Sequence, residues 1–303
     1  MEKRYWIHAV TPIHVGSGRG LGYIDLPVAR EAVTSWPYIP GSSIKGVIAD
    51  KFNATEEARK KSDARPEIVA AFGVSGSDSG SEESTAGALV FTDADIFCLP
   101  VRSFYGTFAW VTSPFCLKRH NVSVKLPEYI HSDDAFITVN SVLTSLGGSE
   151  VYLEDLNLEA VDDPELRRGL EEFALGISKS IFPGKDDWQR MFADRFVVVS
   201  DDVFTFLCTS GTEVTAHIKI DPKTGTAQDG ALWYEEALPV ESILLGRVWC
   251  DKVYKKRPGG EIPPDELMRE FCTEPLRLQL GGKASTGKGQ VNCIFEAVDQ
   301  NGN

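Results

Sequence analysis

The chain has 303 residues, of which 42% are hydrophobic and 25% are charged. This composition is typical of a globular protein with a sizeable core, and no run of about 20 apolar residues is present to span a membrane. The formal net charge of −13 disfavours a surface that attracts nucleic acid everywhere, although a binding groove depends only on local charge. Much of the acid lies in residues 150–172, whereas residues 276–290 carry three basic side chains and no acidic one.

The six cysteines are dispersed, without a Cys-x-x-Cys pair or a histidine cluster at zinc-ligand spacing. We therefore expect buried, reduced thiols rather than disulfides or a zinc site. The first 15 residues lack the long apolar core of a signal peptide. A cytoplasmic protein is the resulting expectation.

The first predicted element is a strand over residues 4–10, which are rich in aromatic and branched side chains. Residues 11–27 follow as a long glycine-rich loop, and loops of this length in compact domains are usually functional or disordered. A Pro-Gly turn then precedes a predicted helix with Ser42 or Ser43 as its N-cap.

The middle of the chain contains a segment of glycine, serine and acid over residues 74–86, for which we predict a disordered surface loop. Residues 87–101 resemble a strand. In residues 103–115 the aromatic side chains recur at helical spacing, which predicts a short helix. Residues 196–208 are interpreted as mixed strand and turn.

Residues 212–236 alternate apolar and polar side chains, turn at Asp-Pro-Lys-Thr-Gly and return, which predicts a β-hairpin. A strand over 242–254 and a helix over 263–272 come next. Two further strands, 276–280 and 291–298, flank a late glycine-rich loop. Mixed rather than alternating strands and helices indicate an α+β fold with an antiparallel sheet, compatible with a ferredoxin-like core that carries long insertions in one domain over 1–303.

The late loop, GGKASTGKGQ, is similar to the phosphate-binding loop of ATPases, but it ends in Gly289 where that loop has a magnesium-binding Ser or Thr. A strand rather than a helix is predicted after it, so no helix N-terminus is available for a nucleotide phosphate. The segment that remains is a flexible loop with two lysines and many backbone N–H groups. It is either a phosphate-contacting loop or a plain glycine hairpin.

Three segments together resemble the RAMP superfamily of CRISPR proteins: TPIHVGSGRGLGYIDLP, WPYIPGSSIKGVI and GGKASTGKGQ. Two more, GALVFTDADIFCLPVRSFYGTFAWVTSP and GALWYEEALP, are similar to the backbone subunits of the type III-B (Cmr) effector complex, the fourth Cmr protein family. The resemblance spans nearly the whole chain.

This resemblance implies a subunit that polymerises head-to-tail along a CRISPR guide RNA together with other Cmr subunits. It implies a ferredoxin-like (RRM-like) palm with large insertions and a β-hairpin thumb, for which residues 212–236 are the candidate. The thumb of such proteins kinks the guide–target duplex, and the single-stranded target RNA is cut at six-nucleotide intervals with Mg²⁺ or another divalent metal.

The family's active-site aspartate lies in the loop after the first strand, and Asp25 matches that position. Its carboxylate is expected to hold the metal together with an RNA phosphate or to orient the attacking ribose 2′-OH. Without the resemblance, Asp25 would be interpreted as a turn or capping residue. Asp201 and Asp202 are an alternative carboxylate pair, and Trp233 and Tyr234 either stack on a base or pack against the palm.

The candidate RNA contacts fall in three groups of glycines, hydroxyls and basic side chains. They are His14, Gly16, Ser17, Gly18 and Arg19 in the first loop, Ser42, Ser43 and Lys45 at the first helix, and Lys283, Ser285, Thr286 and Lys288 in the late loop. Each has a plainer alternative: a histidine satisfied by the backbone, a solvated arginine, serine capping, or a glycine turn.

Two other functions stay open at this point. One is a non-catalytic guide-RNA scaffold of the same family, and the other is a metal-independent CRISPR-repeat endoribonuclease with a histidine base. The nuclease hypothesis further requires that the two glycine-rich loops, far apart in sequence, meet beside the carboxylate of Asp25.

Overall fold

The computed structural model describes residues 2–16, 18, 24–61, 63–74, 84–122 and 124–298. Its strands are β1 (Glu2–Ala9), β2 (Tyr38–Ile39), β3 (Leu89–Phe91), β4 (Ala94–Arg102), β5 (Phe108–Thr112), β6 (Asp134–Ile137), β7 (Glu150–Leu153), β8 (Leu156–Ala160), β9 (Phe196–Val199), β10 (Glu213–Ile220), β11 (Ala227–Ala237), β12 (Ile243–Cys250), β13 (Leu276–Gln279) and β14 (Gln290–Ala297). Its helices are α1 (Gly41–Lys51), α2 (Glu56–Arg59), α3 (Pro66–Phe72), α4 (Pro114–Arg119), α5 (Pro164–Ile181), α6 (Asp186–Arg195), α7 (Asp201–Ser210), α8 (Pro264–Phe271) and the 3-10 turn η1 (Ala284–Thr286).

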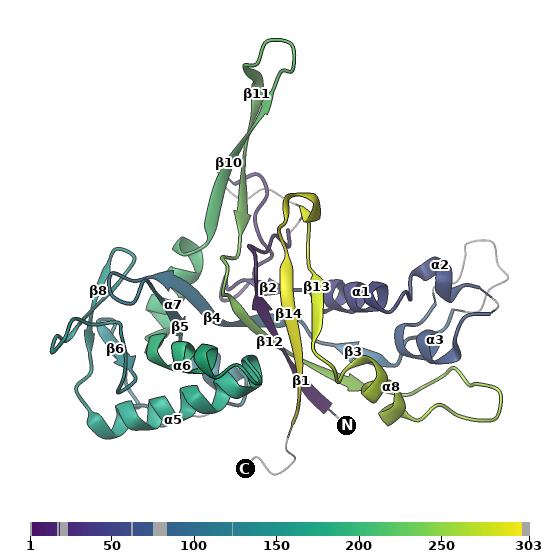
Figure 1. Cartoon of the computed structure of the whole chain (residues 1–303), viewed down its shortest axis with the longest axis horizontal. Coiled ribbons are helices and arrows are strands. Elements are labelled where there is room, and N and C mark those ends of the chain that lie inside the picture. Colours follow the sequence, from purple (N-terminus) through teal and green to yellow (C-terminus); the bar gives the residue numbers. More distant parts are fainter. Residues whose placement is uncertain are drawn as a thin grey trace.

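A long mixed sheet organises these elements, in the order β13-β14-β1-β12-β4-β5-β9-β6-β8-β7 (Figure 1). Short strands extend it, because β2 pairs with β4 and β3 pairs with β12. Most pairs are antiparallel, and only β5–β9 and β6–β8 are parallel among the strands that the structure describes. The predicted α+β class with a largely antiparallel sheet is confirmed.

Strand β1 lies at the centre of the core, between β12 and β14. Its side chains alternate between two covered faces, as the period of a strand requires. On one face Lys3 donates to the backbone carbonyl of Cys272, directly after α8. On the other face the ring of His8 packs against Phe182 and Trp188, where α5 and α6 meet. The aromatic and branched residues of this strand are buried for that reason.

Helix α1 begins without the predicted serine cap. Its N-cap is Pro40, and no side chain of that residue caps the helix. Instead, the backbone N–H of Gly41 donates to Asp93 Oδ1 at 2.8 Å, so a residue 52 positions away takes the capping role. Ser42 and Ser43 therefore lie inside the first turn, and the prediction of either as N-cap was wrong.

The helix predicted over 103–115 is also wrong. Residues 108–112 form β5, which pairs with β4 on one side and β9 on the other. A helix begins only at Pro114, where Ser113 Oγ accepts from the N–H of Cys116. The aromatic spacing that suggested a helix instead serves a strand that is largely buried. Residues 201–210 form helix α7 after β9, where the sequence had indicated mixed strand and turn.

The hairpin predicted over 212–236 is confirmed as β10 and β11, which form a two-stranded sheet of their own. It rises away from the main sheet (Figure 1). Its outer half exposes apolar side chains, including Ile218 at 54% and the opposite Leu232 at 54%. Its base is buried, because Glu235, Glu236 and Ala237 are almost inaccessible to solvent.

The six cysteines are free thiols, and five of them are buried, as expected. Burial raises the pKa of Cys116 to about 12, so this thiol stays protonated. Of the loop predicted over 74–86, residues 75–83 lie outside the described part, and Val74 and Thr85 pair with each other through two backbone hydrogen bonds. In the described part of the chain, no helix is long and apolar enough to cross a bilayer.

Candidate nucleic-acid interface

The two glycine-rich loops pack directly on each other. The N–H of Gly282 donates to the carbonyl of His14 at 2.9 Å, and the N–H of Gly289 donates to the carbonyl of Pro12 at 2.8 Å. A Cβ on Gly281, whose φ is +78°, would lie 2.1 Å from the carbonyl oxygen of His14, so only glycine permits this approach. The prediction that the two loops meet is confirmed.

The late loop differs from an ATPase loop in the element on its C-terminal side. After η1 the chain enters strand β14 at Gln290, whereas an ATPase loop leads into a helix whose N-terminus holds the phosphate. The loop is a turn in which Lys283, Gly287 and Gly289 adopt left-handed backbone conformations. The sequence-based exclusion of an ATPase is therefore supported by the geometry.

Asp25 lies at the base of the hairpin. Residues 24–28 run beside β11, because the N–H of Leu26 donates to Tyr234 and the N–H of Glu236 donates to Leu26. This pairing presents the carboxylate of Asp25 to the backbone N–H of Tyr234, which donates to Oδ2 at 2.8 Å. Asp25 is exposed and forms no ion pair with the residues that the structure describes. Its carboxylate is thus fixed in place while remaining accessible.

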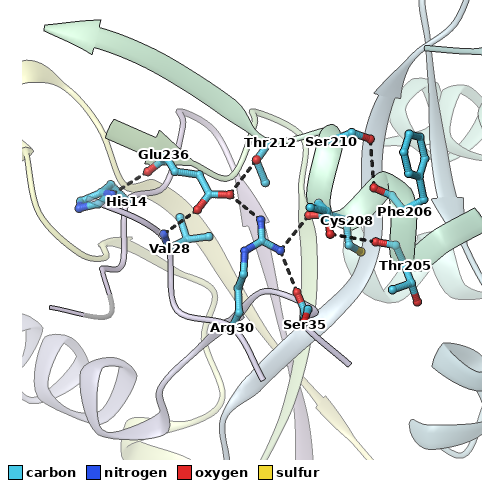
Figure 2. A network of polar contacts seen from close by, with 11 residues as sticks. His14, Val28, Arg30, Ser35, Thr205, Phe206, Cys208, Ser210, Thr212 and Glu236 are labelled. Atoms are coloured by element: carbon cyan, nitrogen blue, oxygen red, sulfur yellow. Dashed lines mark hydrogen bonds and ion pairs between the residues drawn. The ribbon is translucent and has the colours of Figure 1, made fainter. Parts of the chain in front are cut away.

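Glu236 holds the segment after Asp25 against the hairpin base through a buried polar network (Figure 2). Its Oε2 accepts from the N–H of Val28 at 2.9 Å, and its Oε1 accepts from Thr212 at 2.8 Å. The same Oε1 pairs with Arg30 Nη2 at 2.5 Å. Arg30 also donates to the carbonyls of Ser35 and Cys208. The buried network joins β11, the first loop and the end of α7, and it holds the backbone that carries Asp25.

His14 belongs to the same network rather than to an open surface. It is 7% exposed, and its Nδ1 lies 2.7 Å from the carbonyl oxygen of Glu236. A carbonyl only accepts, so Nδ1 carries the proton. A Cβ on Gly16 would lie 3.2 Å from Nε2, so this loop closes over the ring. The geometry matches the alternative of a backbone-satisfied histidine, and an RNA contact of His14 stays a prediction.

The two lysines of the late loop converge on one buried carboxylate. Lys288 Nζ lies 2.7 Å and Lys283 Nζ lies 3.2 Å from Glu235, which is buried on β11. Burial opposes ionisation of Glu235, but hydrogen bonds from Lys288 and Lys283 hold its pKa below the usual value. The side chains of Lys288 and Lys283 are 17% and 36% exposed, so both stay partly accessible to solvent. Both are held at the hairpin base, beside which the segment that carries Asp25 runs, and their contact with RNA stays a prediction.

The remaining residues of the two loops lie mostly at the surface. Ser285 and Thr286 are exposed on the late turn, where Thr286 donates to the carbonyl of Lys283. Gly16 and Gly18 are exposed on the first loop. Ser17 and Arg19 lie outside the described residues. The contacts of these exposed residues with RNA stay predictions.

The group at helix α1 contacts a different part of the fold. Lys45 donates to the carbonyl of Leu89 at 2.7 Å, and burial lowers its pKa. Ser42 is exposed and Ser43 is half-buried. The backbone of Gly41 packs against Phe91 and Thr92. The contacts of this group are therefore with residues 89–93, whereas the late loop contacts residues 12–14.

The alternative carboxylate pair has a structural role. Asp201 and Asp202 occupy the first turn of α7, and Asp201 Oδ1 accepts from the N–H of Phe115. The described part of the chain holds no group of three or more His, Cys, Asp or Glu side chains placed to bind a metal ion. Trp233, the other candidate, stacks on His217 at 5.4 Å between ring centroids, so its ring has a partner within the hairpin.

Sequence reasoning missed the two glutamates, Arg30 and Thr212. Two consecutive glutamates near the end of an alternating strand were the available signal, since one of them must point to each face. Here both faces are covered, so both charges are buried and paired.

The sequence matches the RAMP superfamily model over residues 6–292. It is 28% identical over 310 residues to the CRISPR system Cmr endoribonuclease Cmr4 of Pyrococcus furiosus, covering 98% of this chain and 96% of that protein. It is 26% identical over 317 residues to the CRISPR system CMR subunit Cmr4 of Saccharolobus solfataricus, covering 95% of this chain and 94% of that protein.

Solved structures show the same fold. Oligomeric Cmr4 from Pyrococcus furiosus superposes with a TM-score of 0.68 at 24% identity, over 98% of this chain and 99% of the other. A chain of the type III-B Cmr-beta complex bound to cognate target RNA gives 0.66 at 20% identity, over 97% of both chains. With the family model matched over nearly the full length of the sequence, the chain belongs to the RAMP superfamily.

Proposed function

We propose that this protein is a backbone subunit of a cytoplasmic type III-B CRISPR effector complex, and that it binds guide RNA and cleaves complementary target RNA. The single observation that carries this proposal is the position of Asp25. Its carboxylate is exposed at the base of a projecting hairpin, hydrogen-bonded to Tyr234 N–H, on the first of two packed glycine-rich loops. The names of the two Cmr4 relatives support the assignment.

The chemistry is attack of a ribose 2′-oxygen on the adjacent phosphorus. The O2′–P bond forms and the P–O5′ bond breaks, which gives a 2′,3′-cyclic phosphate and a 5′-hydroxyl. The 2′-OH loses its proton and the leaving 5′-oxygen gains one. In this proposal Asp25 orients the 2′-OH, and the hairpin places the nucleotide so that the attacking and leaving oxygens are in line.

A divalent ion, Mg²⁺ or another, fits this site only together with the RNA. Asp25 is one carboxylate, and Mg²⁺ in proteins is commonly held by one or two carboxylates plus substrate phosphates and water. When bound, the ion would stabilise charge on the phosphate. The hydrogen bond from the N–H of Tyr234 is to Oδ2 of Asp25, so Oδ1 is the oxygen that we propose contacts the RNA.

The proposed palm is ferredoxin-like (RRM-like), with the other elements as insertions. In chain order β1, α1, β4, β12, α8 and β14 follow the β-α-β-β-α-β pattern, and β14-β1-β12-β4 are neighbours in the sheet. The β10–β11 hairpin is the proposed thumb, which would kink the duplex and set six-nucleotide steps in a head-to-tail filament. The acidic residues 150–172 offer a surface for a neighbouring subunit.

The test uses the assembled complex with labelled complementary RNA, with and without Mg²⁺. Asp25→Asn keeps an acceptor for Tyr234 but removes the charge, so we expect cleavage to fall by about 100-fold or more with RNA binding retained. Asp202→Asn is the matched control, because Asp202 is an exposed acid in the first turn of α7.

Three results would contradict parts of the proposal. Full cleavage by Asp25→Asn would remove this residue from catalysis. Binding of guide RNA without cleavage by the wild-type complex would indicate a scaffold. Cleavage of CRISPR-repeat RNA by the isolated chain in EDTA would indicate the stand-alone endoribonuclease.

A further inference from the structure

A cavity of about 430 Å³ opens on the sheet beside the late glycine loop. Its floor is a row of side chains across three neighbouring strands, with Arg277 on β13 opposite Asn292 on β14, which is opposite His8 on β1. Cross-strand neighbours share one face of the sheet. Gln290, two residues before Asn292, contributes from the same face. The floor of the cavity is therefore polar and partly basic.

The wall of the cavity comes from the start of helix α6. Lys185 is exposed there, and Trp188 is half-buried against His8, with 5.7 Å between ring centroids. The cavity thus has a polar floor and one aromatic wall.

The cavity has a positive charge that the described residues do not balance. Glu241 is the only acidic side chain in its lining, and it is paired with His8 at 2.6 Å. Neither Lys185 nor Arg277 has a side-chain partner among the residues that the structure describes. Asp186 and Asp187 follow Lys185 but do not line the cavity. In a chain of net charge −13, two unpaired cations in one concave site indicate an anionic ligand.

The cavity is continuous with the late glycine loop. Gln290 directly follows Gly289, and its N–H donates to Thr11 Oγ1, which also lines the cavity. A nucleic-acid strand lying on the 281–289 turn would therefore reach the cavity over a short distance, because Gln290 and Asn292 in its lining lie only one and three residues beyond Gly289, at about 3.4 Å per strand residue.

We infer that this cavity is a second single-stranded RNA subsite, in which Lys185 and Arg277 hold a phosphate and Trp188 contacts the adjacent base. The inference rests on the proposed function and extends it from the hairpin base to the β13–β14 face. Asn292 and Gln290 carry amide groups that both donate and accept, so they can meet any base edge. The subsite therefore tolerates any sequence, as stacking on an aromatic ring does.

The test measures binding of single-stranded RNA by the full chain over a range of salt concentrations. Each phosphate contact in a single strand contributes about 0.7 to the slope of log K against log salt, so Lys185→Ala with Arg277→Ala is expected to lower the slope by about 1.4. Lys255→Ala with Lys256→Ala removes the same charge from an exposed loop, and there the slope should stay at the wild-type value. Thermal unfolding checks that both double variants are folded.

Guide and target RNA are distinguished in the assembled complex. A loss at the guide-loading step assigns the subsite to the guide, and a loss only on addition of complementary RNA assigns it to the target. An unchanged slope in Lys185→Ala with Arg277→Ala overturns the subsite but leaves the proposed function intact. Loss of self-association at an unchanged slope also overturns it, since the ligand is then another copy of the chain. If the wild-type chain and complex bind no RNA, the proposed function itself fails.

Discussion

The base and the outer half of the β10–β11 hairpin differ in which kind of side chain is buried and which is exposed. At its base Glu235 and Glu236 are buried, and each is surrounded by cations or hydrogen-bond donors. In its outer half Ile218 and Leu232 face each other across the strands and are about half exposed to water. The usual arrangement of charge outside and apolar groups inside is reversed. The hairpin is therefore anchored by paired charges at its base and leaves apolar side chains exposed in its outer half.

Within the base, the two glutamates also differ. Glu236 is saturated, with Val28, Arg30 and Thr212 on its two oxygens. Glu235 faces two partly exposed lysines, with Lys288 Nζ 2.7 Å from its Oε1 and Lys283 Nζ 3.2 Å from its Oε2, and His217 Nε2 lies 3.7 Å from the same Oε2. Glu236 therefore holds the base of the hairpin together. In the proposed function, an RNA phosphate would compete with Glu235 for the two lysines.

The largest expected effect is that of Glu236→Gln. The amide cannot accept at both positions, and Arg30, only 13% exposed at its side chain, loses its counter-ion. Breaking a buried pair from one side costs about 3–5 kcal/mol, so we expect the free energy of unfolding to fall by that amount. Chemical denaturation measures it. A loss below about 1 kcal/mol would show that the network does not hold the base.

Glu235→Gln is expected to destabilise less, by about 1–2 kcal/mol, because Lys283 and Lys288 can turn to solvent when the charge is removed. The freed lysines should then bind RNA more tightly and with a steeper dependence on salt. Titration of single-stranded RNA at several salt concentrations measures this. Equal destabilisation by the two glutamine variants, with no gain in RNA affinity, would remove the distinction between the glutamates.

The pH dependence separates Glu235 from other carboxylates. Because the pKa of Glu235 is lowered in the folded state, its stabilising effect is present above the unfolded value of about 4.3 and is lost as pH falls through the folded value. Asp95 acts in the opposite sense, since burial raises its pKa to about 6 and its ionisation weakens the fold as pH rises.

The measurement is therefore the difference in free energy of unfolding between wild type and Glu235→Gln as a function of pH. The titration of Asp95 contributes equally to both proteins and cancels in this difference. We expect the difference in free energy of unfolding to be constant near neutral pH and to shrink below about pH 4. If this difference in free energy of unfolding grew as the pH fell, the folded state would not favour the ionised form of Glu235.

The hairpin shows how far sequence reasoning reaches. The alternation in 212–236 predicted its strands, and the Asp-Pro-Lys-Thr-Gly turn predicted its reversal, because both signals are local. The burial of Glu235 and Glu236 was missed because their partners are distant in sequence. Lys288, the partner of Glu235, lies about 50 residues after it, and Arg30, the partner of Glu236, lies about 200 residues before it. The prediction of a serine cap for α1 was wrong for the same reason, since Asp93, which accepts from the N–H of Gly41, is distant in sequence.

The meeting of the two glycine-rich loops was predicted through the family resemblance, whereas its physical cause needed coordinates. Glycine is required at 281 because the carbonyl of His14 occupies the place of a side chain. The helix predicted over 103–115 failed because pairing with β4 and β9 decides the conformation there, and the spacing of aromatic residues does not report pairing.

The smallest effect on stability is expected at the outer half of the hairpin. Replacement of Ile218 and Leu232 by serine removes one exposed cross-strand pair, which contributes about 1 kcal/mol or less. If these side chains serve an external partner, as the proposed thumb requires, the double variant should keep its unfolding midpoint and lose several-fold in cleavage of complementary RNA by the assembled complex. A large loss of stability would instead place the pair in the folding core. Unchanged stability with unchanged cleavage would mean that this exposed pair has no part in the reaction.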